Sequence, residues 1–180
     1  MKLLIVDDEQ IEREGMMAIL NRAFPELKIE QANNGYQAIE VSRRFQPDLV
    51  LMDIQMPGMN GLEAIEQIHA EYPYIKFVMV TAFDTFNYVQ SALKLGAKDY
   101  ILKPSKVSEI RATVGKVLKE IEEERELFTE SKLQSEMLQK TFALVETDIV
   151  TQLLFDHVHE VHVNMLVEMV DIPSTNEMFV

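Results

Sequence analysis

Short runs of hydrophobic residues alternate, over the first two thirds of the chain, with longer stretches in which hydrophobic positions recur at a helical period. The runs are Leu3–Val6, Leu27–Glu30, Leu49–Met52, Phe77–Val80 and Tyr100–Leu102, and the helix-period stretches lie near residues 10–24, 35–46, 61–71, 84–95 and 106–121. Continuous apolar runs of Val, Ile and Leu are typical of strands buried on both faces. Alternation of strand and helix at this spacing predicts right-handed crossovers and a parallel sheet. We expect a three-layer α/β domain over about residues 1–122.

The rest of the chain has a different pattern. From Lys116 to Ile172 there is no Gly or Pro, so no residue of either type interrupts a helix. Apolar positions at steps of four, three and four make a coiled-coil-like seam in the fifth helical stretch: Ile110, Val114, Val117 and Ile121. The stepping is looser afterwards, which leaves room for a break between residues 145 and 160. We expect a long fifth helix that continues into a helical or coiled-coil linker over residues 123–172, and such a helix needs a partner helix.

Composition narrows the class of protein. The chain has 180 residues, of which 47% are hydrophobic and 26% charged, as in ordinary globular proteins. It has no Cys, which excludes disulfides and thiolate metal sites and suits a reducing cytoplasm. The apolar start is too short for a signal peptide, and no run reaches the roughly 18 residues of a membrane span. These features predict a cytoplasmic protein without a membrane segment.

Charge is distributed unevenly. Residues 1–120 carry 14 Lys and Arg against 17 Asp and Glu, whereas residues 121–180 carry 3 against 13. A nucleic-acid surface needs clustered basic residues to neutralise phosphates. The segment after residue 120 therefore does not have the composition of such a surface.

Carboxylates follow two of the predicted strands. In a flavodoxin-like, doubly wound sheet of order 2-1-3-4-5, the first and third strands are neighbours at the switch point, where functional groups gather beyond the strand ends. Asp7 and Asp8 follow the first strand and Asp53 ends the third, so all three should converge, with Thr81 and Lys103 at the rim. An all-oxygen site without His or Cys favours Mg²⁺. An Asp carboxylate can also act as a nucleophile and form an aspartyl phosphate.

Four segments together resemble the receiver domain of bacterial two-component response regulators: "LLIVDDE", "PDLVLMDIQMPGMNGLE", "VMVTAFD" and "LKLGAKDYILKP". The resemblance covers about 120 residues. It implies a phosphoacceptor switch rather than an enzyme, with Asp53 accepting phosphate from a sensor histidine kinase. It implies a Mg²⁺ ion held by Asp53, directly by Asp8, mostly through water by Asp7, and by the backbone carbonyl of Gln55.

The same resemblance assigns further roles. Thr81 and Lys103 would contact the phosphoryl group, and the Lys103–Pro104 peptide bond would be cis. Tyr100 takes the place of the aromatic switch residue, with Thr81 as the other switch residue. Gln55 and Phe83 take positions that tune the lifetime of the phosphorylated state.

A finer resemblance concerns the type of regulator. The stretches "TAFDTFNYVQSALKLGAKDYILKP" and "VTQLLFDHV…LVEMVDIPSTNEMFV" are similar to receivers and linkers of regulators that end in an AraC-type helix-turn-helix. This implies that residues 173–180 begin a missing downstream module, and that DNA is bound only through a missing C-terminal domain. Phosphorylation would remodel the face formed by the fourth helix, fifth strand and fifth helix, and a homodimer is expected.

Other functions remain to be weighed. A stand-alone receiver or scaffold module, acting by protein–protein interaction without DNA-binding output, is the main alternative. A Mg²⁺-dependent phosphohydrolase of the haloacid dehalogenase type needs an Asp-x-Asp pair, but Gln55 stands where the second Asp would be. His159 and His162 share one helical face with no third metal ligand evident in the sequence, so we interpret them, with His157, as solvated or packed histidines.

Overall fold

The computed structural model describes the backbone of residues 1–82 and 96–170, and the side chains of residues 1–82 and 96–139. The chain divides into two compact units, Met1–Arg125 and Glu126–Val180. The sheet and the candidate site lie in the first unit, and the described part of the second unit is helical. Among the described residues, no helix combines the length and apolar character needed to cross a membrane.

Five parallel strands form the sheet: β1 (Lys2–Val6), β2 (Lys28–Ala32), β3 (Leu49–Asp53), β4 (Lys76–Thr81) and β5 (Ala97–Leu102). Their order is β2-β1-β3-β4-β5, so the predicted flavodoxin-like topology is confirmed. The central strands β1, β3 and β4 are almost entirely buried, because helices cover both faces of the sheet. The edge strands β2 and β5 have partly exposed positions.

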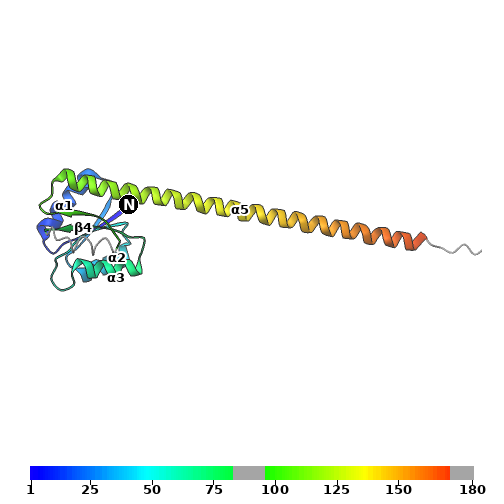
Figure 1. The fold of residues 1–180 in the computed structure, drawn as a ribbon, viewed down its shortest axis with the longest axis horizontal. Helices are drawn as coiled ribbons and strands as arrows, with labels where there is room; N and C mark the ends of the chain where they lie inside the picture. Colours follow the sequence, from blue (N-terminus) through cyan, green and yellow to red (C-terminus); the bar gives the residue numbers. More distant parts are fainter. Residues whose placement is uncertain (83–95, 171–180) are drawn as a thin grey trace, which may run out of the picture. The chain divides into compact units, whose positions relative to one another are not determined.

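Within residues 1–82 and 96–170, four helices pack around or extend from this sheet: α1 (Gln10–Ala23), α2 (Gly35–Phe45), α3 (Gly61–Glu71) and α5 (Val107–Val170). One core cluster joins α2 and α3 to one face of the sheet, and a second joins α1 and the beginning of α5 to the other face (Figure 1). The three layers therefore agree with the prediction. The helix expected near residues 84–95 lies outside the described residues.

The seam at the beginning of α5 faces the chain's own sheet. Its members are buried in the core cluster that α1 and α5 share with the strands: Ile110, Val114, Val117 and Ile121. The coiled-coil-like stepping therefore reflects packing within the first unit, and it says nothing about a partner helix. The break between residues 145 and 160 does not occur, because α5 is continuous from Val107 to Val170.

Ion pairs tie α5 to the amino end of the sheet just before the boundary between the units. The Lys76 ammonium lies 2.6 Å from the Glu124 carboxylate, and the Arg125 guanidinium pairs with Asp48, which precedes β3. Asp48 is buried and also accepts the backbone N–H of Lys2 at 2.8 Å. These contacts fix the direction in which α5 passes the sheet as far as Arg125.

Caps at the beginning of α2 and α3 hold the loops that surround the sheet's carboxyl edge. Asn34 accepts the Gln37 N–H at 2.8 Å. At α3, the Asn60 side chain accepts the Glu63 N–H at 2.9 Å, and the Glu63 carboxylate accepts the Asn60 N–H at 3.1 Å. This reciprocal capping box satisfies two backbone donors at once and begins α3 at a defined residue.

Candidate functional site

Three carboxylates converge beyond the carboxyl ends of β1 and β3. The register of the two strands pairs Val6 with Met52, so the next residues, Asp7 and Asp53, lie side by side. One carboxylate oxygen from each of Asp7, Asp8 and Asp53 lies within 4.8 Å of the others. Asp7 and Asp53 are buried, while Asp8 is exposed. The predicted convergence is thus present in the fold.

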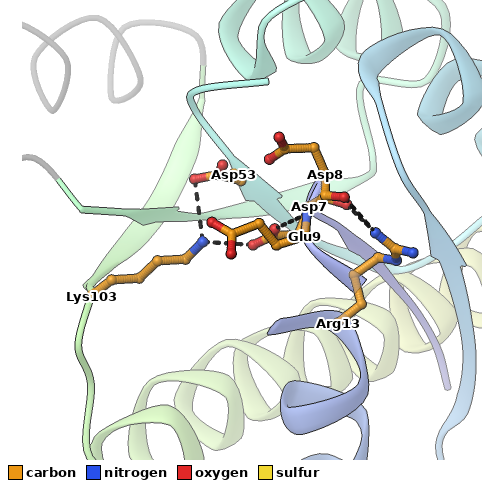
Figure 2. A network of polar contacts seen from close by, with 6 residues as sticks. All are labelled: Asp7, Asp8, Glu9, Arg13, Asp53 and Lys103. Carbon is orange, nitrogen blue, oxygen red and sulfur yellow. Dashed lines mark hydrogen bonds and ion pairs between the residues drawn. The ribbon is translucent and has the colours of Figure 1, made fainter. Parts of the chain in front are cut away.

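The Asp7 carboxylate already has a donor on each oxygen. Its Oδ1 accepts the Glu9 N–H at 2.9 Å, and its Oδ2 accepts the Lys103 ammonium at 2.6 Å (Figure 2). The same ammonium lies 3.7 Å from Oδ1 of Asp53. In the described part of the chain, no hydrogen bond or ion pair reaches the Asp8 carboxylate. Asp8 and Asp53 are therefore better placed than Asp7 to offer an oxygen directly to a cation.

The electrostatics of Asp53 follow from its burial. Desolvation raises the pKa of Asp53 from 3.8 to about 6. The Lys103 ammonium lowers this pKa, whereas the charges of Asp7 and Asp8 raise it. Burial alone would lower the pKa of Lys103, but its hydrogen bond to Asp7 and the charges of Asp53 and Asp7 outweigh burial and raise it. Lys103 is thus a firmly charged cation beside a carboxylate that is hard to ionise.

This cluster has the donor set of a magnesium site. Three like charges held within 4.8 Å of one another repel, and the Lys103 ammonium offsets only part of that repulsion. A small divalent cation with oxygen ligands relieves the remainder, and Mg²⁺ characteristically binds one or two carboxylates while keeping several waters. The residues present therefore fit a Mg²⁺ ion.

The loop after β3 approaches Asp53 so closely that one position requires Gly. A Cβ atom on Gly61 would lie 2.0 Å from the backbone oxygen of Asp53. Gly61 also donates its N–H to the carbonyl of Ile54 at 2.9 Å. The loop between β3 and α3 therefore folds back tightly over the end of β3. This close contact holds the backbone of Asp53, from which its carboxylate extends, in a defined position.

The remaining predicted residues are placed as follows. Thr81 is the last residue of β4 and is buried, and its carbonyl accepts the Lys103 N–H at 2.7 Å. The Lys103–Pro104 peptide bond is cis, as expected. Tyr100 lies on β5 with 46% of its surface exposed, and Gln55 is exposed in the loop after β3. Phe83 lies outside the described residues, as do the side chains of the α5 histidines.

Two residues that the sequence analysis did not single out also contact the site. Glu9 donates its backbone N–H to Asp7. Arg13, on α1, donates through its guanidinium to the carbonyls of both Asp7 and Asp8 (Figure 2). The only signal in the sequence is a basic residue about one turn into the helix that follows the acidic pair, which is too common to be diagnostic.

The sequence matches the model of the response regulator receiver domain over residues 3–115. The chain belongs to the response regulator receiver family. It is 36% identical over 121 residues to the uncharacterized transcriptional regulatory protein YesN of Bacillus subtilis, covering 67% of this chain and 33% of YesN. It is 39% identical over 118 residues to the chemotaxis protein CheY of Thermotoga maritima, covering 66% of this chain and 98% of CheY.

Among solved structures, the receiver domain of AraT, a response regulator from Geobacillus stearothermophilus, superposes with a TM-score of 0.62 and 34% identity. The match covers 69% of this chain and 97% of that domain. A receiver domain is a phosphoacceptor switch rather than an enzyme, and its presence implies a histidine kinase partner. The chain spans about a third of YesN but almost all of CheY. Membership of the receiver family therefore does not by itself assign the output that the receiver controls.

Proposed function

We propose that Asp53 is the phosphoacceptor of this receiver. The observation that carries the proposal is the cluster at the sheet edge, in which a buried Asp53 lies beside Asp7, Asp8 and the Lys103 ammonium. An oxygen of the Asp53 carboxylate attacks the phosphorus of a phosphohistidine, the P–N bond breaks, and an acyl phosphate forms. The imidazole leaves with the electron pair of that bond and takes a proton from water.

The other groups of the site bind and neutralise the phosphoryl oxygens, which is most of what phosphoryl transfer demands. Lys103 supplies a charge 3.7 Å from Asp53, and the Thr81 hydroxyl would donate a hydrogen bond from the end of the neighbouring strand β4. Asp8, Asp53 and the backbone carbonyl of Gln55 would hold Mg²⁺ directly, and Asp7 would hold it through water. When bound, the ion neutralises charge on the acceptor and on the phosphoryl group.

The free Asp8 carboxylate and the doubly engaged Asp7 carboxylate support this division between direct and water-mediated ligands. Asp7 would give up hydrogen bonds if it met a cation directly, because both of its oxygens already accept one. Asp8 would give up no described hydrogen bond if its carboxylate met the cation directly.

Phosphorylation adds nearly two negative charges to a buried strand end and thereby shifts an existing conformational equilibrium. Thr81 and Lys103 respond to the phosphoryl group, and Tyr100 changes its exposure on β5. The half-exposed ring of Tyr100 supports this role, because a half-buried aromatic can move to either side at modest cost. The change remodels the face of the predicted fourth helical stretch (residues 84–95), β5 and α5, and that face and the linker make a homodimer.

For output, we propose transcription regulation by an AraC-type DNA-binding domain beyond residue 172. On this proposal residues 1–122 are the receiver, residues 123–172 the linker and residues 173–180 the beginning of the output module. The change from one compact unit to another at Arg125 supports the first boundary. Two relatives named as transcriptional regulatory proteins, YesN and LnrK of Bacillus subtilis, extend far beyond their matched regions.

A second output is favoured by a specific observation. CheY of Thermotoga maritima and the sporulation initiation phosphotransferase F of Bacillus subtilis are matched over 98% and 93% of their lengths. The receiver could therefore act alone through protein contacts. A basic helix-turn-helix encoded after residue 180 would exclude this alternative.

Intact mass measurement tests the phosphoacceptor directly. The full chain is incubated with Mg²⁺ and a small-molecule phosphodonor, beside Asp53→Ala, a sample without Mg²⁺, and Glu66→Ala as a control for loss of an exposed acid on α3. We expect one added phosphoryl mass in the wild type and in Glu66→Ala, and none in the other two samples. An equal gain in Asp53→Ala would reject Asp53 as the acceptor.

A further inference from the structure

Arg13 contacts the backbone of the acidic loop from the side opposite Asp53. Its Nη1 donates to the carbonyl oxygen of Asp7 at 2.7 Å and to that of Asp8 at 3.1 Å. Its Nε donates to the side-chain oxygen of Gln31 on β2 at 3.3 Å. One guanidinium thus connects α1, the loop after β1 and the neighbouring strand.

The two carbonyls belong to successive peptide groups at the point where the chain leaves β1 for α1. Figure 2 shows the Asp8 carbonyl pointing to Arg13 and the Asp8 carboxylate pointing to the side of Asp53. The same loop is held by the Arg13 N–H, which donates to the Glu9 carbonyl at 3.2 Å. The orientation of the Asp8 side chain therefore depends on how its backbone is held, because no described contact holds its carboxylate.

We propose that Arg13 is a positioning residue for the divalent cation: by binding the Asp7 and Asp8 carbonyls it presets the loop so that both carboxylates face Asp53. This inference rests on the proposed Mg²⁺ site. The planar guanidinium suits the task because Nη1 reaches both carbonyls while Nε, fixed in the same plane, bonds Gln31 on β2. Its positive charge also offsets the repulsion among the three acids. A Lys side chain carries the same charge on a single nitrogen and has no second donor fixed in the same plane for Gln31, so it holds the loop less firmly.

The expected effect follows from what outer partners of metal ligands contribute. Removing such a partner typically lowers metal affinity by about 10- to 100-fold. Arg13 acts through the backbone of one direct ligand, Asp8, and of Asp7, which binds through water, so Arg13→Met should weaken Mg²⁺ binding by at least about tenfold. Arg13→Lys should fall between Arg13→Met and the wild type.

The experiment is a Mg²⁺ titration of the full chain, followed by amide chemical shifts of Asp8 and Asp53, without phosphodonor. Arg13→Met and Arg13→Lys are compared with Arg22→Met, an exposed basic residue of the same helix outside the site. Amide hydrogen exchange at Asp8 and Glu9 in the metal-free proteins is measured in parallel. We expect faster exchange at these two amides in Arg13→Met, a Mg²⁺ midpoint raised at least about tenfold, and no change in Arg22→Met.

A Mg²⁺ midpoint within twofold of the wild type in Arg13→Met would overturn the proposal. If Arg13→Met does not fold, the Mg²⁺ midpoint of Arg13→Lys tests the proposal instead. A midpoint of Arg13→Lys equal to that of the wild type would also overturn the proposal. Absence of Mg²⁺ binding in the wild type would overturn the proposal together with the metal site. Mg²⁺ binding by a wild type that gains no phosphoryl mass would count against phosphorylation by small donors only and leave the role of Arg13 standing, since the titration uses no phosphodonor.

Discussion

Asp53→Asn should make the metal-free protein more stable while abolishing its proposed function. Asn has nearly the same shape as Asp but carries no charge. A carboxyl group whose pKa is higher in the folded protein than in the unfolded chain holds its proton more tightly when folded. The free energy of unfolding therefore falls as the pH rises from 3.8 towards about 6. Above that pH Asp53 is ionised in both states, and the whole loss of stability caused by its buried charge remains.

The magnitude comes from the shift itself. One pKa unit corresponds to about 1.4 kcal/mol, so the rise of the Asp53 pKa from 3.8 to about 6 corresponds to about 3 kcal/mol. Asp53→Asn should raise the free energy of unfolding by about this amount at pH 7.5, and by about half of it at pH 5. The gain should shrink when Mg²⁺ is added, because the cation stabilises the ionised wild type only.

The assay is urea unfolding in the presence of a chelator, followed by tyrosine fluorescence. All five Tyr residues lie before residue 101 and the chain has no Trp, so the signal reports the first compact unit. Glu66→Gln, an exposed acid on α3, is the matched control and should change the free energy of unfolding by less than about 0.5 kcal/mol.

An Asp53→Asn protein that is equally or less stable than the wild type at pH 7.5 would refute the reasoning. So would a gain that does not change between pH 5 and pH 7.5, since only the titration of Asp53 predicts that change.

Three further predictions concern the loop, the cap and the linker. Gly61→Ala should lower the free energy of unfolding by about 3 kcal/mol or more, because its Cβ would meet the Asp53 carbonyl at 2.0 Å. Gly15→Ala on α1, where a Cβ meets nothing within 4 Å, should instead add about 0.5–1 kcal/mol; equal urea midpoints for the two variants would contradict this. Asn60→Ala should cost about 1 kcal/mol by removing the capping box of α3, and an unchanged urea midpoint would contradict it. Truncation after Glu130 keeps the ion pairs of α5 with the sheet and should weaken dimerisation; an unchanged monomer–dimer constant in analytical ultracentrifugation would refute a linker-mediated dimer.

Some elements were easier to predict than others for a physical reason. The strands β1, β3 and β4 are buried on both faces, so their sequences are continuous apolar runs that stand out from the rest of the chain. The edge strand β2 is partly exposed, and its predicted range, Leu27–Glu30, was shifted from the observed Lys28–Ala32. The apolar run predicted only Tyr100–Leu102 for β5, whereas the strand begins at Ala97. Its first positions were missed because exposed and partly exposed polar residues interrupt the apolar pattern there.

The length of α5 was only partly readable. The absence of Gly and Pro predicted a long helix, and the looser apolar stepping after Ile121 was wrongly taken as room for a break between residues 145 and 160. The stepping at Ile110 and Val114 was similar to a coiled-coil seam, because a helix packed on a sheet and a helix packed on a helix both need an apolar stripe.

The sequence by itself was enough to predict a parallel sheet with Asp7, Asp8 and Asp53 at one edge. Parallel strands deliver their carboxyl ends to one edge, so the position of a residue along the chain is enough to place it there. Only the tertiary structure decided which oxygens Lys103 and Glu9 engage, how deeply Asp53 is buried, and that Arg13 reaches the loop's carbonyls. Those properties depend on distances of a few ångströms between residues up to 96 positions apart, and no local pattern encodes such distances.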